Sequence, residues 1–395
     1  MSVRKRTWTT AKGKEKECWI VDYVDQHGER RGKNFAKKKD ADAYHATVTV
    51  EVRHGTHTPD SQSITVAEAG QLWVTTAETN DLERATTVEY ARHLRLHIIP
   101  HIGRTRLSQL SAPVVRQFED KLRLAGASPA MVKKVRGSLS MLIADAQERG
   151  LINRNPVREL SRRKERRAER RQKGRLQVGV DIPAPDEVGR ILGNLAGWRR
   201  PLLMTAIFTG LRASELRGLP WSNVDLKNGR IHVRQRADRY NKIGKPKSEA
   251  GDRTVPVPPI LLNTLREWRL VCPKGALDLV FPNGRGNVIR LDYIIEWALK
   301  PVQVKAGVVD VDGKAKYTGM HALRHFYASW CINRKADGGQ ELPLKVVQSR
   351  LGHSTIAMTA DTLRPPVPWY QQRGRDGGGR IGADQTQHGR NVMGN

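Results

Sequence analysis

Arg212 and Lys247 are cationic residues whose sequence surroundings suit them to binding and protonating a phosphate. Arg212 follows Gly210, which allows a sharp turn, and precedes a predicted helix with Glu215 in its first turn. Near a helix N-terminus, backbone N–H groups and a guanidinium can hold a phosphate together. Lys247 lies in a turn segment, residues 241–251, where a hairpin could place its ammonium beside a phosphate oxygen. Taken alone, each is more often a solvated surface residue.

Two histidines and a second arginine follow further along the chain. His321 and Arg324 are three residues apart on a predicted helix, so they share one face. His353 comes directly after Gly352, which ends a helical stretch at residues 344–350. A lone histidine is more often a satisfied core residue than a catalyst. The significance therefore lies in the ordered set of arginine, lysine, His-x-x-Arg and Leu-Gly-His.

The elements that must position this set fall within residues 183–362, a region of mixed helix and strand. Residues 230–236 and 253–257 are short β-like runs on either side of the lysine turn. Helical patterns account for much of the remainder of the region. We expect a mixed, mainly helical catalytic domain with a small β-sheet.

A small α+β unit is expected over residues 1–58. Residues 18–24 alternate apolar and polar side chains as a strand does, residues 30–36 can pair back with them, and residues 37–52 have helical periodicity. This sheet could lie in a DNA groove, or its basic residues could form only a solvated face. The basic residues in question are Arg4, Lys5, Arg6, Lys12 and Lys14.

Residues 64–160 are helical throughout and predict an all-α bundle of four or five helices. Residues 87–98 and 128–149 place apolar side chains on one face and His, Arg or Lys on the other. A basic interdomain linker is expected at residues 161–182. Residues 161–175 include nine Arg or Lys and no large apolar side chain, so they form either a solvated spacer or a strap across a phosphate backbone.

The net charge of the chain favours a polyanionic partner. Among 395 residues, Lys and Arg number 69 against 40 Asp and Glu, for a formal net charge of +29. An excess of this size points first to nucleic acid. An anionic membrane is the rival, but no apolar run approaches the length of a spanning helix. The three cysteines (Cys18, Cys272, Cys331) are widely spaced, which argues against a disulfide framework or zinc site and for a reducing cytosol.

Taken together, the motifs resemble the catalytic signature of the tyrosine recombinases, the phage-integrase family. The resemblance is close over the C-terminal domain. It extends more loosely to the helical unit, which looks like the family's core-site-binding domain, and to the N-terminal unit, which looks like an arm-site-binding domain. The motifs that carry it are TGLRASEL (209–216), PKS (246–248) with RTVPV (253–257), HALRH (321–325) and LGHSTIAMTADT (351–362).

The resemblance implies a role for each residue of the set. Arg212 and Arg324 would hold the non-bridging oxygens of a phosphodiester in the transition state. Lys247 would protonate the departing 5′ oxygen. His321 and His353 would hydrogen-bond the phosphate and help to deprotonate a tyrosine nucleophile, which conserves bond energy as a 3′-phosphotyrosyl link. Rejoining then needs no cofactor and no metal.

The position of the expected nucleophile holds Leu363 instead of tyrosine. In the family the tyrosine follows the Leu-Gly-His histidine by nine or ten residues, in a run like DTYGHLFP. Here the match extends through Thr362 and then stops. Tyr370 is the substitute left downstream, but it lies seven residues late, behind three prolines that prevent a regular helix from positioning it. We expect an aberrant, disordered tail at residues 363–395.

A one-base insertion in the gene explains this break. The codons ACC TAC GGC CAC CTG TTC CC encode Thr-Tyr-Gly-His-Leu-Phe-Pro. One C inserted after the first codon gives ACC CTA CGG CCA CCT GTT CCC, which encodes Thr-Leu-Arg-Pro-Pro-Val-Pro, the residues at 362–368. We hypothesise that a frameshift, real or from sequencing, replaced the C-terminus from Leu363 onward.

Two functions remain open at this point. The first is site-specific DNA recombination in phage integration and excision, with double-stranded attachment sites as substrate, a homotetramer on DNA, and possible accessory DNA-bending or directionality proteins. The second is a catalytically inactive, site-specific DNA-binding protein derived from an integrase. A simple helix-turn-helix regulator leaves the five catalytic positions unexplained. Either function places the chain in the cytoplasm of a bacterial host, associated with the nucleoid and with no membrane partner.

Overall fold

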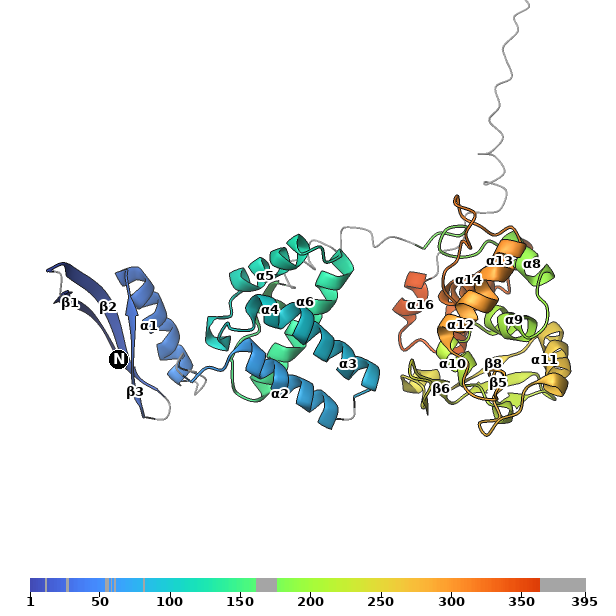
Figure 1. The fold of residues 1–395 in the computed structure, drawn as a ribbon, viewed down its shortest axis with the longest axis horizontal. Coiled ribbons are helices and arrows are strands. Elements are labelled where there is room, and N and C mark those ends of the chain that lie inside the picture. The colour runs from blue at the N-terminus through green and yellow to red at the C-terminus, as the bar shows by residue number, and fades with distance from the viewer. Residues whose placement is uncertain are drawn as a thin grey trace, which may run out of the picture. The chain divides into compact units, whose positions relative to one another are not determined.

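The computed structural model of this chain is helix-rich with small sheets (Figure 1). It describes residues 1–10, 13–25, 28–53, 57, 59, 62–80, 82–160 and 176–362. The expected nucleophile position Leu363, its substitute Tyr370, the tail and the linker segment 161–175 lie outside these residues. The chain divides into two compact units, Met1–Gln172 and Lys173–Asn395.

The first unit begins with a three-stranded antiparallel sheet in the order β1-β2-β3. The strands are β1 (Ser2–Thr9), β2 (Glu15–Val24) and β3 (Arg30–Phe35). Helix α1 (Lys38–Arg53) covers one face and buries Val21 against Val48 (Figure 1). The apolar alternation did not reveal β1, because nearly all of its side chains are exposed.

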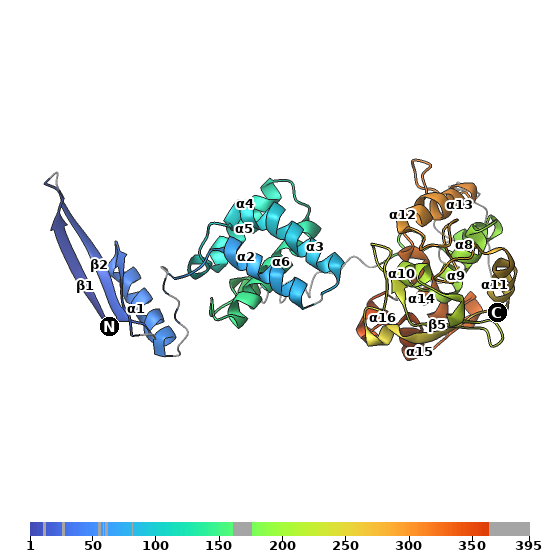
Figure 2. The ribbon, with the colours of Figure 1, turned by 60° about the horizontal axis from the view of Figure 1, so that its bottom comes forward.

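A helical bundle follows in the same unit (Figure 2). It has its own hydrophobic core. Thr65 caps the first helix with a capping box, and Ser128 accepts a hydrogen bond from the backbone of Met131 at the start of the last. A π-helical turn precedes Pro100, which has no N–H to continue the regular ladder. The helices are α2 (Val66–Thr79), α3 (Arg84–His93), the π-turn (Leu94–Ile98), α4 (Ile99–Ile102), α5 (Ala112–Leu124) and α6 (Pro129–Glu148).

The second unit surrounds a small antiparallel sheet with helices. Strands β4 (Val224–Asp225), β5 (Arg230–Val233) and β8 (Arg253–Pro256) form the sheet, and β6 (Arg236–Ala237) pairs with β7 (Ile243–Gly244) in a separate hairpin. The helices are α8 (Pro185–Gly193), α9 (Arg199–Thr209), α10 (Ala213–Arg217), α11 (Pro259–Val271), α12 (Leu291–Ile294), α13 (Lys300–Lys305), α14 (His321–Ile332), α15 (Leu344–Leu351) and α16 (Ile356–Thr362).

Helix α9 is the core of this unit, packed against α11 and against α14 (Figures 1 and 2). Eight of its eleven residues are buried, as expected for a helix that is apolar on every side. Both packing partners follow it in the chain, with many residues between. Burial of α9 therefore fixes where its C-terminal end, and the turn that follows it, lie among the other elements.

The linker predicted at residues 161–182 extends too far, because its last residues belong to the second unit. Ile182 is buried in the core of the second unit, and Leu176 and Val178 pack against the same core. The phenolic O–H of Tyr317 also donates to the carbonyl of Ile182. These apolar side chains follow the basic run and gain burial by joining the second unit.

None of the helices in the described part of the chain is long and apolar enough to span a membrane.

Candidate active site

Arg212 lies at the turn that connects α9 to α10. Gly210 has φ +60°, and a Cβ at that position would lie 2.3 Å from a ring carbon of Tyr327, so only glycine fits. Arg212 then caps α10 with extended backbone angles. Its Nη1 donates to Glu215 at 2.7 Å and its Nη2 donates to the carbonyl of Gly352 at 3.0 Å. The guanidinium is therefore aimed at the Leu-Gly-His turn.

Arg324 reaches the same turn from the first part of α14. Its side chain is buried, Nη1 donates to the carbonyl of Gly210 at 2.6 Å, and Nη2 donates to the carbonyl of Leu351. Burial, and then the neighbouring charge of Arg212, lower the pKa of Arg324 to about 9. Two guanidinium groups from different helices thus meet beside consecutive carbonyls, Leu351 and Gly352. An anion bound between them would relieve their repulsion.

Glu215 and Arg253 form a buried ion pair behind this cluster. Arg253 donates Nη1 to Oε1 of Glu215 at 3.0 Å and Nη2 to Oε2 at 2.8 Å. The carboxylate also accepts the backbone N–H of Arg212 at 2.8 Å. Burial alone would raise the pKa of Glu215, but the hydrogen bonds and charges of Arg253 and Arg212 outweigh it and hold the pKa at about 2. The helix-start N–H of Arg212 is thereby occupied by Glu215 and is not available to a phosphate.

Arg253 also joins the lysine segment to the Leu-Gly-His turn. Its Nε donates to the carbonyl of Arg350 at 2.7 Å and its Nη1 to the carbonyl of Gly251 at 3.0 Å. Gly352 has φ +63°, and a Cβ there would lie 2.6 Å from the carbonyl oxygen of Ala250. The turn before His353 therefore packs directly on the segment that follows Lys247.

The two histidines lie beside the arginines. His353 Nδ1 is 3.0 Å from the hydroxyl of Thr359 on α16. Burial, followed by the charges of Arg324 and Arg212, lowers the pKa of His353 to about 4. His321, exposed at the start of α14, has its pKa lowered by partial desolvation and by the same two arginines. Both imidazoles are therefore held toward the neutral form, which accepts protons.

Lys247 is exposed in the segment between β7 and β8. The β5–β8 pairing, with Val233 opposite Arg253, holds the two ends of this segment together. Pro246 packs under Gly251, where a Cβ would lie 2.6 Å from the proline side chain. Arg212, Arg324, His321 and His353 are thus drawn into one cluster, and Lys247 extends from a segment that Arg253 ties to it.

Glu215 and Arg253 lie within the motifs TGLRASEL and RTVPV but were not predicted as site residues. A usable signal was present, because Glu215 is the one carboxylate between Glu187 and Asp225 in the sequence. A buried carboxylate requires a cationic partner, yet nothing local identified Arg253, which is 38 positions away. Only the tertiary structure brings Arg253 on β8 next to Glu215 on α10.

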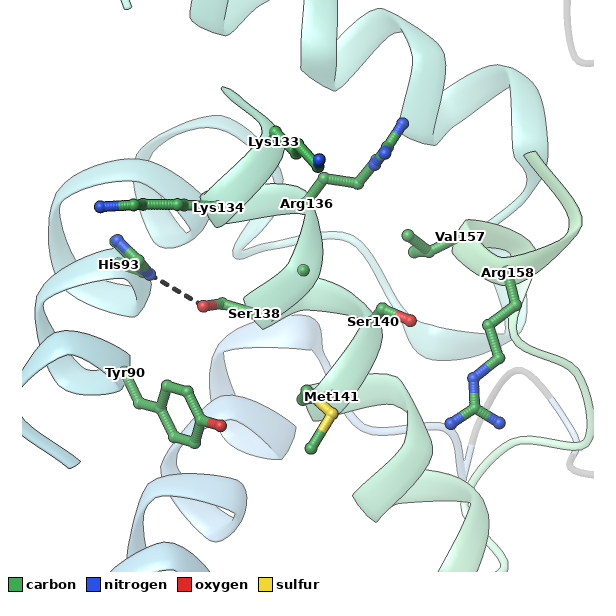
Figure 3. A pocket seen from close by; sticks show the side chains of 11 residues that line it. Tyr90, His93, Lys133, Lys134, Arg136, Ser138, Ser140, Met141, Val157 and Arg158 are labelled. Atoms are coloured by element: carbon green, nitrogen blue, oxygen red, sulfur yellow. Dashed lines mark hydrogen bonds between the residues drawn. The ribbon is translucent and has the colours of Figure 1, made fainter. Parts of the chain in front are cut away.

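A second concentration of positive charge lies in the helical bundle, in a concave groove of about 540 Å³ between α3 and α6 (Figure 3). His93 projects from α3 and its Nδ1 is 2.8 Å from the hydroxyl of Ser138. Four basic side chains line the groove and no acidic one does. The lining residues are Tyr90, His93, Lys133, Lys134, Arg136, Gly137, Ser138, Ser140, Met141, Val157 and Arg158. We call this surface the basic groove.

Residues 184–362 match the model of a protein family described as the phage integrase family. A tyrosine recombinase XerC-like protein of Caldanaerobacter subterraneus subsp. tengcongensis is 25% identical over 372 residues, covering 87% of this chain and 90% of that protein. Tyrosine recombinase XerC of Xylella fastidiosa (strain 9a5c) is 35% identical over 161 residues. That alignment covers 40% of this chain and about half, 46%, of the relative.

Solved structures of similar fold include the Tn1549 transposon integrase in complex with a circular intermediate DNA. It has a TM-score of 0.60 and 20% identity, covering 80% of this chain and 99% of that one. A lambda integrase tetramer bound to a Holliday junction has a TM-score of 0.55 and 16% identity, covering 91% and 94%. At these identities the likeness concerns the fold.

Proposed function

Because the chain belongs to the phage integrase family of tyrosine recombinases, which break and rejoin DNA strands, we propose that its phosphate pocket is built for site-specific recombination. The substrate is a double-stranded attachment site, and the reaction is the integration or excision of phage DNA. The observation that carries the proposal is the meeting of Arg212 and Arg324 beside the Leu351 and Gly352 carbonyls.

Arg212 and Arg324 bind the non-bridging oxygens of the scissile phosphate. Each guanidinium has five N–H groups, and two of them are used in the contacts given for each residue within the described part of the chain. Those contacts fix each side chain before DNA arrives. A pre-oriented pair of donors stabilises the charge that develops in the transition state without further reorganisation.

Lys247 and the two histidines move protons. A neutral His353, or His321, accepts a hydrogen bond from the hydroxyl of the nucleophile and takes up its proton as a general base. The ring N–H of either imidazole can donate to a phosphate oxygen. Lys247 delivers a proton to the departing 5′ oxygen, so that the leaving group is a hydroxyl. Its ammonium is exposed on a segment that Arg253 anchors, which suits a residue that must reach into DNA. This chemistry uses no cofactor and no metal.

Two further surfaces suit DNA. Residues 64–160 are proposed as the core-site-binding domain, because the basic groove offers two exposed lysines and an exposed arginine to a duplex. Residues 1–58 are proposed as an arm-site-binding domain, because Arg4, Lys5 and Arg6 are exposed on β1. On DNA the active form would be a homotetramer, with accessory DNA-bending or directionality proteins as further partners. The proposed site of action is the bacterial nucleoid.

The second candidate function is site-specific DNA binding without catalysis. The observation that favours it is Leu363 at the position expected for the nucleophile. A polypeptide without a nucleophile would still bind its site through the pocket and the DNA-binding surfaces. Under the frameshift hypothesis, the inserted base is either present in the gene or an error in its sequence. Sequencing the gene across codons 360–370 tests this, and a frame that restores no tyrosine at position 363 contradicts the hypothesis.

A nicked suicide substrate tests the activity itself. The duplex is first selected from a random-sequence pool by the full chain. The frame-corrected chain should form a covalent protein–DNA adduct, and the chain with Leu363 should bind the same duplex without one. Failure of the corrected chain to form an adduct overturns the proposed recombination. An adduct of the uncorrected chain that Tyr370→Phe abolishes would assign the nucleophile to Tyr370.

A further inference from the structure

Gly137 interrupts the exposed face of α6 in the wall of the basic groove. Glycine is the least favourable residue other than proline in a helix interior. The φ of Gly137 lies outside the left-handed region, and a Cβ at this position would meet no atom within 4 Å. Neither the backbone conformation nor the packing of the described residues requires glycine here.

The side chains around Gly137 also favour an anionic partner. Lys133 and Met141 lie one helical turn to either side of Gly137, and Lys134 lies three residues before it. Lys133, Lys134 and Met141 are all exposed. Within the described part of the chain, no ion pair joins Lys133 or Lys134 to a carboxylate. The open space above Gly137 is therefore flanked by uncompensated positive charge.

We propose that Gly137 is the point of closest approach between the helical bundle and double-stranded DNA. The sugar–phosphate backbone fills the space that a side chain would occupy, and Lys133 and Lys134 neutralise the phosphates beside it. Duplex DNA carries one negative charge per about 1.7 Å of its axis, which complements the charge of the groove. This inference rests on the proposed DNA-binding function and adds which turn of which helix the duplex touches.

The substitution Gly137→Ala should affect stability and DNA binding in opposite directions. The free protein gains helix propensity without a clash, so the thermal transition of its unit should rise by about 4 °C. The new methyl group occupies the space of the DNA backbone, so affinity for the selected duplex should fall about tenfold. Calorimetry measures the first effect and fluorescence anisotropy at fixed salt measures the second.

Gly189→Ala is the matched control. Gly189 is also an exposed glycine inside a helix, α8, and a Cβ there also meets nothing within 4 Å. Gly189→Ala should raise the thermal transition of the second unit and leave the affinity for DNA unchanged. If it weakens binding as much as Gly137→Ala does, the loss is not specific to the groove and the inference is wrong.

Salt dependence separates steric exclusion from lost charge. Gly137→Ala should leave the slope of log K against log salt concentration unchanged, since no phosphate contact is removed. Amide exchange at residues 133–141 should slow when the selected duplex binds the unaltered chain. Unchanged affinity of Gly137→Ala, or no protection at these amides, overturns the inference while DNA binding itself stands. A chain that selects and binds no duplex overturns the proposed function with it.

Discussion

The phosphate pocket of the second unit and the basic groove of the helical bundle use cations in different ways. In the pocket, Arg212, Arg253 and Arg324 are each held by two or more hydrogen bonds, and Gly210 and Gly352 leave no room for a methyl group. The groove has open space above a glycine and exposed lysines along one helix face. The contacts that orient the pocket arginines are therefore made within the protein itself.

The difference follows from what each surface has to accomplish. Transition-state stabilisation depends on donors that are already oriented, which the buried Glu215–Arg253 pair enforces at the pocket. Attraction of a duplex depends on charge number and on room for close approach, which the groove supplies. Substitutions in the pocket should therefore cost stability, whereas those in the groove should cost affinity. Four predictions test this contrast, from the largest expected effect to the smallest.

Glu215→Gln should destabilise the second unit by about 4 kcal/mol, because it leaves the buried Arg253 and the partly buried Arg212 without a compensating charge. Chemical denaturation measures the loss. The control is Glu296→Gln, which removes an exposed partner of Lys300 and should change stability by about 0.5 kcal/mol or less. The pKa of Glu215, about 2, lies below its ordinary value of 4.5. Its contribution is therefore present above pH 4.5 and disappears as pH falls through about 2. Equal effects of the two substitutions would contradict a buried network.

Gly210→Ala should destabilise by about 3 kcal/mol, since it combines a left-handed backbone with overlap against the Tyr327 ring. Thermal unfolding provides the measurement. The comparison is Gly137→Ala in the groove, which should stabilise. A pair of alanine variants with shifts of the same sign would remove the contrast between the two regions.

His353→Gln should flatten the pH dependence of stability between about pH 6.5 and pH 4. The pKa of His353 is lowered to about 4 in the folded chain, so the unfolded chain binds more protons in that window and acid destabilises the fold. The unaltered chain should lose about 2 kcal/mol more than the variant across the window, after allowance for partial exposure. Urea unfolding at a series of pH values tests this. Parallel curves would show that His353 titrates normally.

Lys134→Ala should leave stability within about 0.5 kcal/mol. It should weaken DNA binding and reduce the slope of log K against log salt by about one unit, the amount expected for one lost phosphate contact. Anisotropy titrations over a range of salt concentrations measure the slope. Lys300→Ala, which changes an exposed lysine of the second unit paired with Glu296, serves as the comparison. An unchanged slope for Lys134→Ala would place the duplex elsewhere.

Local pattern was enough to locate the elements that have clear periodicity. The apolar repeat of residues 128–149 corresponds to α6 (Pro129–Glu148), and the β-like runs at 230–236 and 253–257 include the paired strands β5 and β8. The predicted catalytic residues could also be found from local sequence, because they occur in short motifs. They are Arg212, Lys247, His321, Arg324 and His353. Strand β1 was not predicted, because its side chains do not alternate between buried and exposed. Ile182 was assigned to the linker because a basic run precedes it.

By itself, the sequence determined which residue types and motifs were present, the family they resemble, the excess positive charge, and the leucine at position 363. Only the tertiary structure decided which groups hold the side chains of these residues in place. The partners of Glu215, Arg212 and Arg324 lie far along the chain, at Arg253, Gly352 and Leu351. Hydrogen bonds over such separations depend on how β8, α14 and α15 pack around α9, and no local propensity encodes that packing. The same holds for the empty space at Gly137, which a helical repeat cannot distinguish from a filled one.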